Sequence, residues 1–214
     1  MKNILEKINK RYLSAIILLP LTFLIIIIGG FLLNLAIIIA SIILISEFIT
    51  LTTENKKLND KKSLLITALY IAIPASLLIN MRYLDNGIEA ILYILTIVFI
   101  TDSSAYFGGR YFKGIKLAPK ISPNKTVSGA LIALLSTLLF SIFAFFISNG
   151  YSFLYFIFVS LLISVSSQIG DLLESFIKRK IGVKDSGNLI PGHGGLFDRV
   201  DGILPAIIIG YILL

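Results

Sequence analysis

"YSFLYFIFVSLLISVSSQIGDLLESFIKRK", residues 151–180, joins a long apolar run to a charged end. Its first part is long enough to cross a membrane as a helix, which takes about 20 mostly apolar residues. The polar members recur at intervals of four and three residues, so they share one face of a helix: Ser160, Ser164, Ser167, Asp171, Glu174 and Lys178. This stretch predicts a membrane span whose face is small and polar inside the membrane and ionised where the helix emerges.

The whole chain has the composition of a membrane protein. Of its 214 residues, 57% are hydrophobic and only 14% are charged, against about 25% charged in soluble domains. The absence of cysteine excludes disulfides and thiolate sites, and a single histidine excludes a zinc site with several histidines. The net charge of +7 favours loops beside anionic lipid over a nucleic-acid partner.

Seven apolar segments are candidate spans, and we predict an all-α polytopic membrane protein. They are residues 12–28, 31–49, 63–79, 88–101, 129–148, 151–169 and 203–214. The fourth extends into "DSSAYFGG", which would place Asp102 at the membrane face. The first is too long for a signal peptide and is predicted to be a retained span. We expect one continuous membrane domain, with N-terminal helices over 1–100 and a catalytic region over 101–214.

The basic residues predict the orientation of these spans. Of the 19 Lys and Arg residues, all but Arg82 precede the first span or lie in alternate loops. Cytoplasmic loops are enriched in Lys and Arg. We therefore expect a multi-pass protein of the cell membrane, with its N-terminus in the cytoplasm and its C-terminus outside.

Four carboxylates fall at the predicted cytoplasmic ends of three spans: Asp102, Asp171, Asp198 and Asp201. A carboxylate near the hydrocarbon costs several kcal/mol unless a partner, water or a cation compensates it. Oxygen ligands of this kind suit Mg²⁺, which binds through one or two carboxylates plus substrate phosphates. A structural alternative for Asp198 and Asp201 is that they are favourable charges at a helix N-terminus.

Basic residues and glycines flank these carboxylates. The basic residues are Arg110, Lys125, Lys178, Arg179, Lys184 and Arg199. Lys and Arg bind phosphate, and glycine lets backbone N–H groups approach an anion. This combination predicts phosphoryl or nucleotidyl transfer to a lipid; anchoring to anionic lipid is the alternative for any single basic residue. His193, within "PGHGG", could act as a general acid or base, a phosphate donor or a loop organiser.

Residues 175–201, "SFIKRKIGVKDSGNLIPGHGGLFDRVD", closely resemble the signature of the phosphatidate cytidylyltransferase family, also called CDP-diacylglycerol synthases. "TDSSAYFGGR" and "ISPNKTVSG" upstream also resemble family segments. Here Ser103, Asn124 and Ser128 stand where the family usually has Thr, Lys and Glu. The resemblance covers about residues 101–201. Further upstream, Glu47-Phe48 is weakly similar to the family.

The resemblance implies transfer of CMP from CTP to phosphatidic acid in the lipid bilayer, with Mg²⁺ as cofactor and a second cation left open. It implies metal ligation by Asp171, Asp198 and Asp201, which together with His193 and Lys184 are the expected catalytic residues. The expected substrate-binding residues are Asp102, Arg110, Ser122, Lys125, Thr126, Lys178, Arg179, Asp185, Gly194, Gly195 and Arg199. The family also suggests a homodimer.

Two other functions were weighed. A CTP-dependent kinase of a polyprenol-type lipid alcohol would need a base for the hydroxyl and would release CDP instead of pyrophosphate. An ion-coupled transporter predicts charged residues near the middles of several spans, whereas the carboxylates here cluster at one membrane face.

Overall fold

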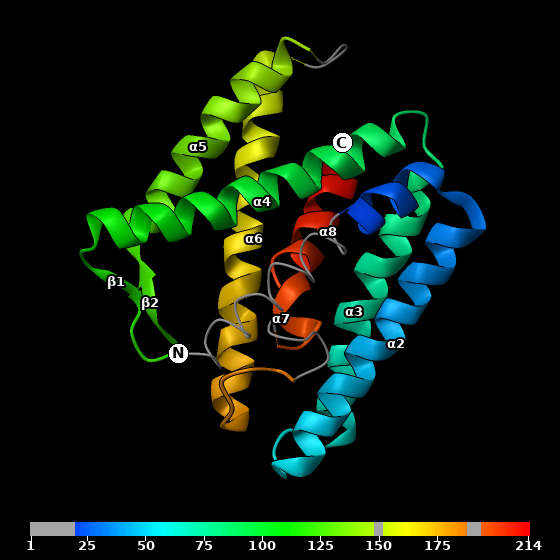
Figure 1. The fold of residues 1–214 in the computed structure, drawn as a ribbon, viewed down its shortest axis with the longest axis vertical. Helices are drawn as coiled ribbons and strands as arrows, with labels where there is room; N and C mark the ends of the chain where they lie inside the picture. The colour runs from blue at the N-terminus through cyan, green and yellow to red at the C-terminus, as the bar shows by residue number, and fades with distance from the viewer. Residues whose placement is uncertain (1–19, 148–151, 188–193) are drawn as a thin grey trace, which may run out of the picture.

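The computed structural model describes residues 20–147, 152–187 and 194–214, and most of them are helical (Figure 1). Five helices are long and apolar enough to cross a membrane: α2 (Gly30–Glu54), α3 (Lys61–Arg82), α4 (Gly87–Phe112), α5 (Val127–Phe145) and α6 (Phe153–Ile181). Many of their large apolar side chains face outward, such as Ile42, Leu139 and Leu154. The predicted helical membrane architecture is therefore confirmed.

The predicted spans match the observed helices except for the first and the seventh. The fourth span continues past residue 101 to Phe112, as expected, so Asp102 lies within α4. Residues 12–19 of the first lie outside the described part, and its residues 20–28 are helical. The seventh is α8 (Ile203–Leu213), whose 11 residues are about 17 Å long, too short for a hydrocarbon core of about 30 Å. Seven full spans are thus not confirmed in the described residues.

The core lies where α4, α6 and α8 meet. Ile94 and Ile97 of α4 pack with Ile163 of α6 and Ala206 of α8, all of them fully buried. The approach of α8 to α4 depends on Gly210, because a Cβ there would lie 2.2 Å from Ile94 Cδ1. This packing brings the short last helices against α6.

The serine face of α6 is a packing seam within the membrane. Ser160 Oγ lies 2.5 Å from Tyr93 Oη, and Ser164 Oγ lies 2.8 Å from Thr101 Oγ1. Ser160, Ser164 and Thr101 are fully buried. Because hydroxyls on adjoining membrane helices satisfy one another in this way, the inner part of this face holds α4 and α6 together.

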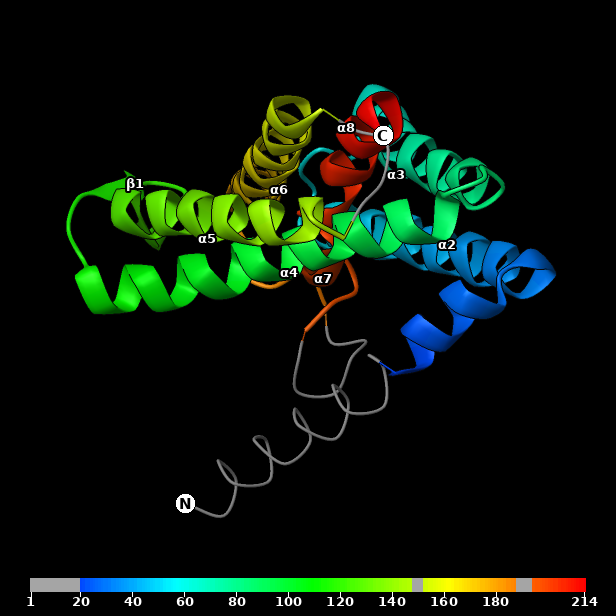
Figure 2. The same cartoon turned by 90° about the horizontal axis from the view of Figure 1, so that it is seen from above.

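A β-hairpin that the sequence analysis did not predict joins α4 to α5. Strand β1 (Lys116–Ala118) pairs antiparallel with β2 (Ser122–Thr126). Thr126 then caps α5, since its Oγ1 accepts a hydrogen bond of 3.1 Å from Gly129 N. Figures 1 and 2 both show the hairpin at the end of α4 and α5 remote from α2 and α3. The hairpin therefore brings the "ISPNKT" segment beside α6.

The two ends of the bundle differ in charge. The α2–α3 turn, the hairpin and the loop after α6 carry clusters of Lys and Arg. At the opposite end, Arg82 donates hydrogen bonds to the carbonyls of Ile26 and Ile27. Leu214 also lies at that end, where it lines a cavity with Asn86 and Ile147. The C-terminal residue is thus remote from the basic loops.

Candidate active site

Three carboxylates meet where α6 lies against the junction of α7 (Phe197–Val200) and α8. One oxygen of each of Asp171, Glu174 and Asp201 lies within 4.8 Å of the other two. Asp171 and Glu174 come from one face of α6, and Asp201 directly follows α7. We call these three residues the carboxylate cluster. It is a donor set of hard oxygens that fits Mg²⁺.

Glu174 is the member of the cluster that the sequence analysis did not assign to the site. It was named only among the polar residues on one face of the helix, and in the structure it forms an i,i+4 ion pair of 3.0 Å with Lys178. Its side chain is only 3% exposed. Its position three residues after Asp171 could have assigned it to the site, because side chains at i and i+3 lie together on a helix.

Asp198 lies beside the carboxylate cluster and has a different set of partners. Its Oδ1 accepts a hydrogen bond of 2.7 Å from Lys178 Nζ, and its Oδ2 accepts from the backbone N–H groups of Ser186 (3.0 Å) and Gly195 (3.2 Å). Burial opposes ionisation, but hydrogen bonds with Glu174, Lys178 and Ser186 outweigh it and lower the pKa of Asp198 to about 2. This ionised carboxylate links Lys178 near the end of α6 to the backbone at Ser186 and Gly195.

The site carries more carboxylates than paired lysines. Lys125 forms an ion pair with Asp171, and Lys178 pairs with both Glu174 and Asp198. Burial, with the charge of Asp171 adding to it, raises the pKa of Asp201 to about 6. Such crowding is unfavourable unless further positive charge is present. The cluster therefore fits a divalent cation by charge as well as by donor type.

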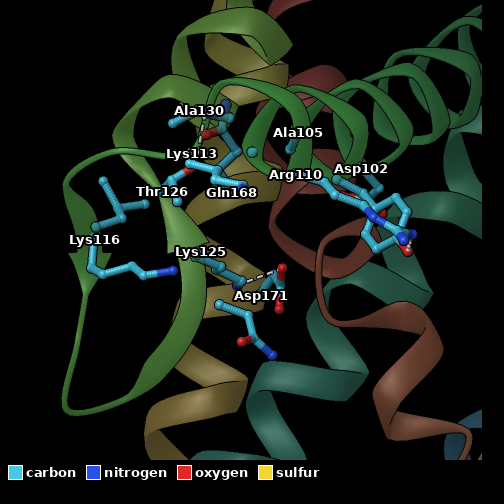
Figure 3. A pocket seen from close by; sticks show the side chains of 15 residues that line it. Asp102, Ala105, Arg110, Lys113, Lys116, Lys125, Thr126, Ala130, Gln168 and Asp171 are labelled. Atoms are coloured by element: carbon cyan, nitrogen blue, oxygen red, sulfur yellow. Dashed lines mark hydrogen bonds and ion pairs between the residues drawn. The ribbon is translucent and has the colours of Figure 1, made fainter.

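A cavity of about 570 Å³ opens next to the cluster, between α4, α5, α6 and the hairpin (Figure 3). Its charged lining residues are Asp102, Arg110, Lys113, Lys116, Lys125 and Asp171. Figure 3 shows Lys116 and Lys125 reaching from the hairpin towards Asp171. Asp171 thus belongs to both the cavity and the carboxylate cluster.

The cavity gathers several of the predicted substrate-binding residues. Asp102, Arg110, Lys125 and Thr126 line it. Lys113 and Lys116 of the same basic segment also line it, although they were not among the predicted substrate-binding residues. Four basic side chains around one cavity can bind a polyanion such as a phosphate chain.

Other predicted substrate-binding residues make contacts within the protein. Arg179 donates hydrogen bonds to the carbonyls of Ile121 (3.1 Å) and Val183 (3.0 Å), which ties the hairpin to the end of α6. Ser122 is paired with Ala118 in the hairpin. These contacts give both residues a part in positioning the hairpin.

Gly194 and Gly195 lie against carboxylates. A Cβ at Gly195 would lie 1.7 Å from Glu47 Oε1, and one at Gly194 would lie 2.8 Å from Asp198 Oδ2. Gly194 also has a φ of +92°, which favours glycine. In the described structure, these glycines permit close approach to side chains of the protein itself.

The remaining predicted residues lie around the site or outside the described part. Lys184 and Asp185 are exposed in the loop after α6, and Arg199 is exposed on α7. His193 falls on residues 188–193, which lie outside the described structure.

Glu47 of α2 also supports the site. Its Oε2 accepts a hydrogen bond of 2.9 Å from the backbone N–H of Phe197, and its Oε1 accepts one of 3.2 Å from Ser186 Oγ. Glu47 thereby holds both the start of α7 and the loop before it. The sequence feature that could have identified Glu47 is its position as a lone carboxylate inside an apolar span, since such residues in membrane helices are usually functional.

Replacing Lys178 by Met should destabilise the protein strongly. The change leaves Glu174 and Asp198, which are 3% and 11% exposed, without their shared cation. Breaking a buried pair in this way costs about 3–5 kcal/mol, so we expect thermal unfolding in detergent on the order of 10 °C lower. Lys180→Met, at an exposed position of the same helix, is the matched control. Equal melting temperatures for the two variants would contradict the expectation.

Comparisons with known proteins agree with this geometry. The model of the cytidylyltransferase family matches residues 51–214. A phosphatidate cytidylyltransferase of Rickettsia felis is 38% identical over 206 residues, which cover 93% of this chain and 88% of that protein. The phosphatidate cytidylyltransferase of Bacillus subtilis is 36% identical over 179 residues, covering 81% and 65% respectively. The similarity therefore extends beyond the signature segment into the N-terminal helices.

Proposed function

The chain belongs to the cytidylyltransferase family, and from this premise we propose that it transfers the CMP part of CTP to phosphatidate. The products are CDP-diacylglycerol and pyrophosphate. The observation that carries the proposal is the double role of Asp171, which lines the basic cavity and belongs to the carboxylate cluster. A cavity that can bind phosphates would thus adjoin a cluster that can hold a divalent cation.

The reaction needs binding and alignment more than acid–base chemistry. The lipid phosphate is already an anion at neutral pH, so one of its oxygens attacks the α-phosphorus of CTP without a strong base. A P–O bond forms there as the bond to the β-phosphate oxygen breaks and pyrophosphate leaves. Arg110, Lys113, Lys116 and Lys125 would hold the two polyanions together and offset their repulsion.

The carboxylate cluster would hold Mg²⁺. Asp171, Glu174 and Asp201 supply the oxygens, and Lys178 with Asp198 keeps Glu174 and the following loop in place. When bound, the cation neutralises charge on the α-phosphoryl group and on the leaving pyrophosphate. Asp198, which we predicted as a ligand, would act in this arrangement through Lys178 and the loop.

We place this site on the cytoplasmic face of the cell membrane. The support is the charge difference between the bundle ends, since Lys and Arg gather in the loops beside the site. The C-terminus would then face outward. A reporter fused after Leu214 should be active outside the cytoplasm, and activity inside would reverse the orientation.

The direct test is incubation of the purified chain with labelled CTP and phosphatidic acid, with and without Mg²⁺. We expect labelled CDP-diacylglycerol and one pyrophosphate for each lipid product, and no product in excess EDTA. Release of CDP with a polyprenol-type alcohol as acceptor would instead identify the lipid kinase weighed above. Product formation in EDTA would overturn the assignment of the cation.

A further inference from the structure

Buried polar atoms without a hydrogen-bond partner concentrate around the carboxylate cluster. Within the described residues there are five such side-chain atoms, on Asn34, Tyr70, Lys125, Ser167 and Glu174. Lys125 and Glu174 are in ion pairs at the site, whereas Tyr70 and Ser167 are uncharged hydroxyls. Buried polar groups are rarely left unpaired, so this concentration indicates groups arranged for an occupant of the site.

Tyr70 comes from α3, a helix that contributes no charged group to the cluster. Tyr70 packs against the apolar cluster that contains Phe197 of α7 and Leu204 of α8, and the short segment between these two residues carries Asp201. This packing places Tyr70 at the α7–α8 junction that carries Asp201, and its Oη atom is buried there without a hydrogen-bond partner among the described residues.

Ser167 marks the same junction from α6. It is fully buried, and its Oγ would lie 2.5 Å from a Cβ at Gly202. Gly202 N in turn donates a hydrogen bond of 2.8 Å to Asp201 Oδ1. Two buried hydroxyls without hydrogen-bond partners among the described residues, from different helices, thus lie at the α7–α8 junction that carries Asp201.

We propose that Tyr70 is a positioning residue whose hydroxyl donates a hydrogen bond to an oxygen atom held with the divalent cation at the carboxylate cluster. This inference rests on the proposed function of the cluster. The oxygen belongs to a water of the cation or to a phosphate of the nucleotide, and both accept a hydrogen bond from a phenol. The bond would orient the cation's ligands without contributing a charge.

The test is Mn²⁺ binding to the purified full-length chain in detergent, measured by electron paramagnetic resonance of the free ion, alone and with CTP. Tyr70→Phe removes only the hydroxyl and keeps the ring that packs against the cluster containing Phe197 and Leu204. We expect Mn²⁺ affinity to fall about three- to tenfold. A loss without CTP identifies a cation-bound water, and a loss only with CTP identifies a phosphate oxygen.

Two further variants separate this inference from the proposed function. Tyr93→Phe, whose hydroxyl contacts Ser160 in the membrane seam, should bind Mn²⁺ like the wild type. Asp171→Asn should lose binding. If Tyr70→Phe equals the wild type in both arms while Asp171→Asn loses binding, Tyr70 has no such role and the metal site stands. If the wild type binds no Mn²⁺ in either arm, both ideas fail.

A stability measurement completes the test. A purely structural hydroxyl would leave Mn²⁺ affinity unchanged and lower the melting temperature when removed. In the proposed role, Tyr70→Phe melts at or above the wild-type temperature without metal, because an unpaired buried hydroxyl has been removed. It should also gain less stabilisation from added Mn²⁺ than the wild type does.

Discussion

Replacing Asp171 by Asn should lower the rate of cytidylyl transfer by about 1,000-fold. Asp171 is the residue shared by the cluster and the cavity, so its charge serves both cation and substrate. A metal ion supplies several kcal/mol of charge stabilisation in the transition state, and a loss of about 4 kcal/mol corresponds to this factor. Initial rates with labelled CTP, measured across a range of Mg²⁺ concentrations, report the effect.

The variant should remain folded, since Asn keeps the size of the side chain and its amide oxygen can still accept a hydrogen bond from Lys125. Asp85→Asn is the matched control, because Asp85 is an exposed carboxylate at the opposite end of the bundle. It should retain the wild-type rate. A rate near normal for Asp171→Asn in monodisperse protein would remove Asp171 from the metal site.

The features that sequence predicted well are those fixed by a single helix. Asp171, Glu174 and Lys178 lie on one face of α6 because their spacing follows the helical repeat. Asp102 lies within α4 because the apolar segment continues into it with helix-compatible residues. Such local relations need no knowledge of neighbouring helices.

The features that sequence did not predict depend on contacts between distant segments. Glu174 joins Asp171 and Asp201, with Asp198 beside them, because of how α7 sits against α6. Glu47 reaches Phe197 across 150 positions of the chain. The hairpin contains strands of three and five residues, too short for a clear alternating pattern. These contacts between distant segments cannot be predicted from the spacing of residues along the chain.

The contact that sets the position of Asp201 gives the second large effect: Gly170→Ala should lower activity about 100-fold. A Cβ at Gly170 would lie 2.3 Å from the carbonyl oxygen of Asp201 and 2.5 Å from Pro205 Cγ. The overlap with the Asp201 carbonyl oxygen can be relieved only if the backbone there moves, so α7 and α8 would shift away from α6. A displacement of about 1 Å at a catalytic group costs on the order of 100-fold in rate.

The intrinsic helix propensity of alanine would by itself stabilise α6 in Gly170→Ala, so it opposes the expected loss of activity. Alanine favours a helix interior over glycine by about 1 kcal/mol, so any loss must come from the contact with Asp201 and Pro205. Ile169→Ala, at a neighbouring position that is 49% exposed, controls for a change in the same turn of α6. Cytidylyl transfer and Mn²⁺ affinity should fall together in Gly170→Ala and stay near normal in the control. Wild-type activity and Mn²⁺ affinity in Gly170→Ala would show that the approach of α6 to Asp201 does not govern the site.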